Sequence, residues 1–98
     1  MSPEITDRLA GLNIQILAEA EKHFLFAREM CVALVERTEA GFGSIGSTGV
    51  MTESGLAYLV WRGDRATLVS KSGEQPADPQ QVEAVRRFSI DLKSGLGL

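Results

Sequence analysis

Apolar residues recur at steps of three or four along the first forty positions of the chain. They are Ile5, Leu9, Leu12, Ile16, Ala20, Phe24, Ala27, Cys31 and Leu34. This spacing places them on one face of an α-helix. An unbroken helix over these residues would be roughly 55 Å long, whereas a domain of about 100 residues has a radius of gyration of about 13 Å. The sequence therefore predicts a long N-terminal helix that overhangs its domain, breaks, or packs on a second copy.

The predicted helix has start and stop signals at its ends and one weak point inside. Ser2, Pro3 and Glu4 suit a helix start, and Gly41 suits a helix end. Gly11, close to Asn13, costs about 1 kcal/mol relative to alanine inside a helix. Whether the helix continues through Gly11, or residues 1–12 form a kinked or frayed extension, stays open at this point.

The second half of the chain favours strands joined by turns. Residues 43–51 are rich in glycine and alternate poorly, which favours a weak or edge strand. Residues 56–61 are apolar on both faces, as in a central strand covered on two sides. Gly63 and Asp64 form a two-residue hairpin signal. A third strand then follows at 65–71, and we expect a loop at 72–77.

The clearest start signal for a helix lies near the C-terminus. Asp78, Pro79 and Gln81 combine a cap, a proline at the first helical position and a capping-box glutamine. The predicted helix buries Val82, Val85, Phe88 and Leu92 and ends near Gly95. Residues 88–92 also alternate with period two, which leaves a strand as the alternative. We expect one α+β domain, residues 1–98: a long N-terminal helix packed on an antiparallel three-stranded meander, closed by the C-terminal helix.

Composition narrows the classes of function. The net charge of −3 argues against nucleic acid as a partner, because phosphate binding needs clustered lysine and arginine. One cysteine cannot form an intramolecular disulfide, which is typical of a cytoplasmic protein. No basic and apolar leader pattern opens the chain, and no apolar run is long enough for a membrane span. We therefore expect a small cytoplasmic domain without a membrane or nucleic-acid role.

The segment from Phe24 to Val35 is apolar almost all round, so it must be buried on more than one side. Either the sheet and the C-terminal helix cover both sides, or a symmetry mate or protein client covers one. We predict a homodimer or client contact anchored by Phe24, Leu25, Val32 and Val35. His23 is either a packed histidine or, across a twofold interface, a group that tunes the dimer with pH.

Residues 41–46 match the G-x-G-x-x-G string, but a helix is expected before them, so a dinucleotide site is not predicted. A looser hypothesis is an anion-binding loop made by Gly43, Ser44, Gly46, Ser47, Thr48 and Gly49. The structural alternative is a flexible connection with a bulged strand.

No catalytic constellation, metal-ligand set or cofactor motif emerges from the residue spacing. The sequence thus favours a non-catalytic, homodimeric interaction or regulatory module. The alternative is a small-ligand or anion-binding protein, or an enzyme completed across a dimer, that uses residues 43–49.

Overall fold

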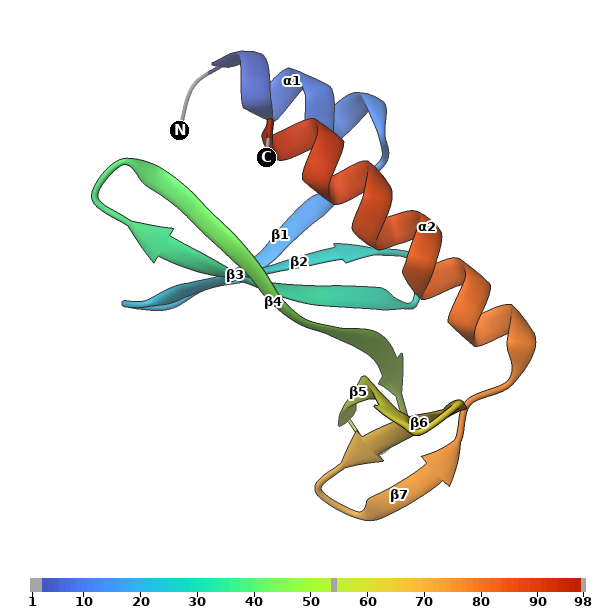
Figure 1. The fold of residues 1–98 in the computed structure, drawn as a ribbon. Helices are drawn as coiled ribbons and strands as arrows, with labels where there is room; N and C mark the ends of the chain where they lie inside the picture. Colours follow the sequence, from blue (N-terminus) through green and yellow to red (C-terminus); the bar gives the residue numbers. More distant parts are fainter. Residues whose placement is uncertain (1–2, 54, 98) are drawn as a thin grey trace.

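The first forty residues form a short helix and three strands rather than one long helix. In the computed structural model, which describes residues 3–53 and 55–97, α1 spans Pro3–Gly11. Strands β1 (Gln15–Glu19), β2 (His23–Arg28) and β3 (Cys31–Thr38) follow (Figure 1). The prediction of a long N-terminal helix is wrong, and the molecule is only 38 Å in its longest dimension.

The helix ends at the weak point that the sequence indicates. The amide of Leu12 donates to the carbonyls of Arg8 and Leu9 at 3.1 Å, which closes the last turn. Asn13 then adopts a left-handed conformation (φ 64°), which asparagine tolerates better than most residues. The chain therefore breaks near Gly11 and leaves as a strand.

The periodicity misled because two short strands joined by a tight turn can imitate a helical stripe. Phe24, Ala27, Cys31 and Leu34 are spaced by three, four and three residues, yet they come from both faces of β2 and β3. Glu29, in the turn between these strands, has φ 55°. Aromatic and β-branched residues on both strands fit a pleated, covered surface.

All seven strands form one antiparallel meander in sequence order, so the prediction of three strands is wrong. The predicted weak strand is part of the twelve-residue β4 (Gly41–Thr52), and the residues expected to form a loop after residue 71 include β7 (Gly73–Pro76). The hairpin prediction is confirmed: Gly63, at φ 68°, lies in the turn between β5 (Gly55–Arg62) and β6 (Arg65–Ser70). β5 is a central strand, as predicted, since it pairs with β4 and β6, but the expected cover on both sides is wrong, because Val60 and Trp61 are exposed.

The C-terminal helix α2 (Pro79–Leu96) is confirmed, including the segment that could have been a strand. The amide of Gln81 donates to Oδ1 of Asp78 at 2.7 Å, and the amide of Asp78 donates to Oε1 of Gln81 at 3.0 Å. This capping box satisfies donors that the first turn leaves without helical partners.

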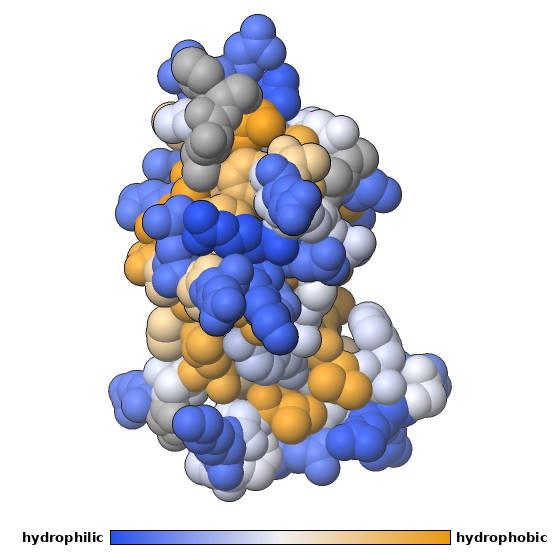
Figure 2. All heavy atoms as spheres, turned by 90° about the vertical axis from the view of Figure 1, so that its left-hand side faces the viewer, coloured by the Kyte–Doolittle hydropathy of each residue, from blue (hydrophilic) through white to orange (hydrophobic). Residues whose placement is uncertain are grey.

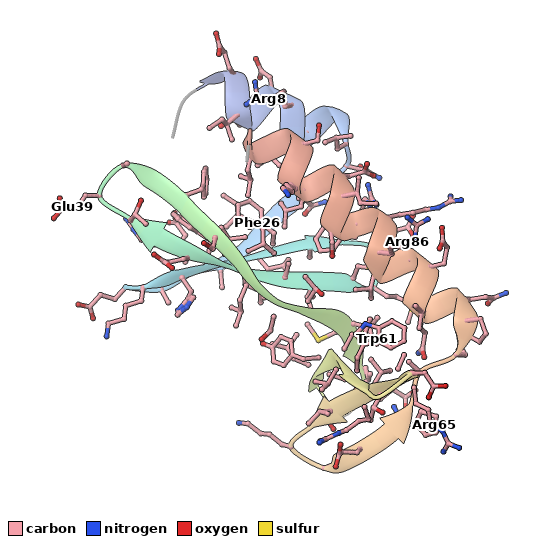
Figure 3. The ribbon with its side chains drawn as sticks, viewed as in Figure 1. Arg8, Phe26, Glu39, Trp61, Arg65 and Arg86 are labelled. Carbon is pink, nitrogen blue, oxygen red and sulfur yellow. The ribbon has the colours of Figure 1, made fainter. Side chains whose placement is uncertain are left out.

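Both helices lie on one side of the sheet, which we call the inner face (Figure 1). The core between α2 and the sheet contains Phe26 and Phe88, both fully buried (Figure 3). Arg28 joins β2 to α2, because it donates to Asp91 at 2.7 Å and its guanidinium lies 5.5 Å from the centre of the Phe88 ring. Arg8 of α1 donates to the carbonyl of Gly95 at 3.0 Å. The core therefore holds α2 against the inner face and α1 against the end of α2.

The sheet bends where β4 changes partners, at Gly49. This residue pairs with Val32 of β3 on one side and with Tyr58 of β5 on the other. A Cβ atom at Gly49 would overlap the carbonyl oxygen of Ala57 and lie 2.7 Å from Cα of Tyr58. Since backbone cannot move aside as a side chain can, only glycine fits here.

We predict that Gly49→Ala lowers the free energy of unfolding by roughly 3 kcal/mol, because the methyl group forces β4 and β5 apart. Gly46→Ala is the matched control in the same strand, since its Cβ would meet only the Leu34 carbonyl oxygen, at 3.5 Å. Urea unfolding followed by circular dichroism measures both variants. Equal stability of the two would contradict a bend that requires glycine.

Candidate functional site

Strand register defines the face of the sheet opposite α2, which we call the outer face. Ala27, Val32, Gly49, Tyr58 and Val69 are paired in succession from β2 to β6. Directly opposed residues of an antiparallel sheet point to the same side. The neighbours of these residues, such as Phe26 and Val50, belong to the core on the inner face. The row therefore runs across the outer face.

The outer face is apolar across five strands. Its apolar residues are Leu25, Ala27, Val32, Leu34, Met51, Leu56, Tyr58, Val60 and Val69. Antiparallel sheets with one face in water normally alternate apolar and polar residues, and β2, β3 and β5 do not. No described helix covers this face (Figure 1). Figure 2, turned to show the left-hand side of Figure 1, shows hydrophobic side chains at the surface in its upper and lower parts, with hydrophilic residues between them.

Burial on this face decreases from the centre outwards. Val32 is fully buried although no described helix lies over it, and it is paired with Gly49 at the bend. Leu25, Leu34 and Tyr58 are half-buried, while Val60 is 36% exposed. Val32, beside the bend, is thus buried, whereas the apolar residues around it remain partly in contact with solvent.

The four predicted anchor residues divide between the two faces. Phe24 and Val35 are buried in the inner core, where the ring of Phe24 lies 4.9 Å from that of Phe42. Leu25 and Val32 lie on the outer face. Their role in partner binding stays a prediction. The sequence does not indicate that β4–β6 contribute to the outer face, although the segment that forms β5 is apolar on both sides.

His23 is exposed and directly opposite Glu36 at one end of the outer face. Cys31 lies on the inner side of β3 and is buried in the core. Among residues 3–53 and 55–97, no three His, Cys, Asp or Glu side chains come together as metal ligands do.

Residues 43–49 lie inside β4, so they form a strand, as predicted for residues 43–51, rather than the loop of the anion-binding hypothesis. The strand is bulged, with register shifts on either side of Val35. Gly43, Ser44 and Ile45 line a pocket of about 540 Å³ together with Lys93 of α2. Gly46, Ser47, Thr48 and Gly49 do not line it. The fold therefore separates residues 43–45 from the rest of the predicted anion-binding residues. It also places one positive charge, that of Lys93, beside residues 43–45.

The two edge strands are poorly suited to pairing with another chain. In β1 the register shifts between Ile16 and Ala18, which leaves Leu17 as a bulge. In β7, Pro76 has no amide hydrogen to donate. Bulges and prolines are common devices against edge-to-edge association. These edges therefore favour the outer face, rather than a sheet edge, as the contact surface.

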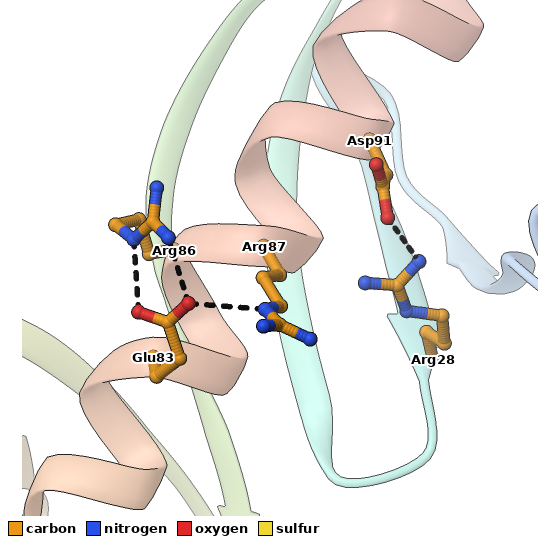
Figure 4. Close-up of polar contacts among 5 residues, drawn as sticks. All are labelled: Arg28, Glu83, Arg86, Arg87 and Asp91. Atoms are coloured by element: carbon orange, nitrogen blue, oxygen red, sulfur yellow. Dashed lines mark hydrogen bonds and ion pairs between the residues drawn. The ribbon is translucent and has the colours of Figure 1, made fainter.

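The exposed side of α2 carries charges that satisfy one another (Figure 4). Glu83 accepts hydrogen bonds from Arg86 and Arg87, which lower the pKa of its carboxyl group to about 2. Glu83 therefore stays ionised at neutral pH, and this network is a solvated helix surface rather than an open anion site.

Comparisons of the chain with protein-family models, curated proteins and solved structures return no match. Neither of the described helices is long and apolar enough to cross a bilayer. The outer face is thus singled out by its own geometry.

We predict that Cys31 is unreactive in the folded protein, because burial raises the pKa of its thiol and the core shields it. A water-soluble disulfide reagent at pH 8 should label the native protein at least about a hundredfold more slowly than the urea-unfolded protein. Absorbance of the released thiolate follows the reaction. Rapid labelling of the native state would place Cys31 at an accessible surface.

Proposed function

We propose that this protein is a non-catalytic protein-interaction module that binds a protein partner on the outer face of its sheet. The observation that carries the proposal is the row of half-buried apolar residues over β2–β6, which no described helix covers. Exposed apolar patches rimmed by polar residues are typical of interaction sites. A cytoplasmic location, predicted from the single cysteine, is part of the same proposal.

The chemistry of the surface favours a protein over other partners. Tyr58 lies at its centre, and tyrosine is enriched where protein interfaces bury side chains. The net charge of −3 disfavours anionic lipid surfaces and nucleic acid. The charged groups assigned to this face lie at its margins: His23 and Glu36 at one corner, and Arg62, Arg65 and Glu74 at another. The centre is therefore suited to packing rather than to proton transfer.

A photoreactive phenylalanine analogue placed at Val60 tests the surface. Val60 is 36% exposed on the outer face, and Ile90 of α2, at 53% exposed, provides the matched control position. Irradiation in cells followed by mass spectrometry should yield discrete protein adducts from position 60 and none from position 90. Equal adduct yields at the two positions, or none at position 60, would overturn the proposal.

A second candidate function has one observation in its favour. The sequence hypothesis of an anion-binding stretch at 43–49 provides no positive charge of its own, and the fold places Lys93 beside Gly43, Ser44 and Ile45 in one pocket. An ammonium group, a serine hydroxyl and an apolar wall suit a small anionic ligand.

Inorganic phosphate serves as the probe for this second candidate. If the pocket binds anions, about 10–20 mM phosphate should raise the melting temperature of the wild type, because ligand binding stabilises the folded state. The melting temperature of Lys93→Gln should not change. Lys71→Gln, in an exposed turn, is the control that should respond like the wild type. Identical shifts in all three proteins would exclude Lys93 as an anion ligand.

A further inference from the structure

We propose that a pocket beside the β5–β6 turn, at the margin of the outer face, binds a small organic carboxylate. The pocket has a volume of about 720 Å³ and is lined by residues of β5, β6 and β7. Pockets of about 300–1,000 Å³ are typical of small-ligand sites. The inference goes beyond the proposed protein contact, since it concerns a small ligand and its test requires no protein partner.

The polar side chains of this pocket all belong to the outer face. Arg62 and Arg65 are directly paired across β5 and β6, and Thr67 follows Arg65 by two residues, on the same side of β6. Pro76 of β7 is paired with Thr67, and Glu74 precedes Pro76 by two residues. Figure 3 shows Arg65 beside the part of the chain that leads into α2. Two arginines, a hydroxyl group and a carboxylate therefore line one pocket.

The charges in the pocket leave one positive charge without a partner. Arg62 donates from Nε and Nη2 to Oε1 of Glu74, at 3.1 and 2.5 Å. Arg65 takes part in none of the ion pairs found among residues 3–53 and 55–97. Because Glu74 balances only one of the two arginines, the pocket suits a ligand with a single negative charge. A phosphate dianion would bring a second negative charge close to Glu74.

The hairpin itself does not explain why two arginines face each other. The left-handed residue of the turn is Gly63, at φ 68°, and neither flanking position has to be basic. Like charges directly opposite each other in an antiparallel pair are unfavourable. A carboxylate bound at Arg65 would offset this repulsion, as Glu74 does for Arg62.

The groups around Arg65 suit an organic carboxylate rather than a simple ion. A planar guanidinium donates two parallel hydrogen bonds to a carboxylate. The hydroxyl group of Thr67, which is half-buried, is a further donor in the pocket. Pro76 and Ala77 provide an apolar wall for the rest of the ligand. A carboxylate with a small apolar body therefore fits both the charge and the lining.

Sodium benzoate is the probe for this site, because it joins a carboxylate to a small apolar ring. Heteronuclear NMR at constant ionic strength should show benzoate-dependent shifts of the amides of Arg65, Thr67 and Ala77. Arg65→Gln should raise the dissociation constant at least about tenfold, because it removes charge-assisted hydrogen bonds. Benzyl alcohol, which has the same ring without the charge, should leave these amides unchanged.

Two variants serve as controls and should bind benzoate like the wild type. Arg86→Gln removes the same charge from an exposed arginine on α2. Lys93→Gln tests whether the pocket beside residues 43–45 causes the shifts. Circular dichroism shows that each variant is folded.

Several outcomes would overturn the inference. Equal benzoate affinity in Arg65→Gln and Arg86→Gln would remove Arg65 from the site, and the same shifts with benzyl alcohol would remove the role of the charge. Tighter binding of inorganic phosphate than of benzoate would overturn the carboxylate as the ligand class. A blocked dipeptide with a free C-terminal carboxylate that binds about tenfold more tightly than benzoate would replace the small acid by the end of a protein chain. None of these results depends on the adducts expected from position 60, so failure of this inference and failure of the proposed function are distinguished.

Discussion

The two halves of the sheet are joined where β4 pairs on both sides, at Gly49 and Val50. From Gly41 to Val50 this strand pairs with β3, and from Gly49 to Thr52 it pairs with β5. Among the described residues, Gly49 and Val50 are the two that are paired with both β3 and β5. The close approach of the β5 backbone to Gly49 sets the bend at this point. Val32, which is paired with Gly49 at the bend, is fully buried on a face that no described helix covers.

The helices depend on the same sheet but cover only its inner face. Phe26 of β2 and Phe88 of α2 meet in one core, and Arg28 ties β2 to Asp91. Since α2 is the last element and returns over the inner side of β3 and β4, the chain has no described segment left for the outer side. An outer face without a covering helix thus follows from the order of the elements. The proposed protein partner would cover this face.

Local signals in the sequence were reliable where one or two residues decide the geometry. Asp78 and Gln81 cap α2, and Gly63 lies in the β5–β6 turn, as their residue types indicate. Gly11 and Asn13 mark the end of α1. The spacing of apolar residues by three or four predicted a helix wrongly between residues 15 and 38. Short strands joined by tight turns match this spacing by coincidence. A turn centred on Glu29 and Met30 carries no glycine or proline to reveal it.

The candidate site was visible in the sequence only as an excess of apolar residues. Leu25 and Val32 are singled out by that excess and do lie on the outer face, whereas Phe24 and Val35 belong to the core. The sequence by itself determined that the segment around them must be covered on two sides, since hydrophobic burial depends on composition. Which side each residue faces was decided only by the tertiary structure. Strand register and the bend at Gly49 come from pairing between distant segments, and no local spacing encodes them.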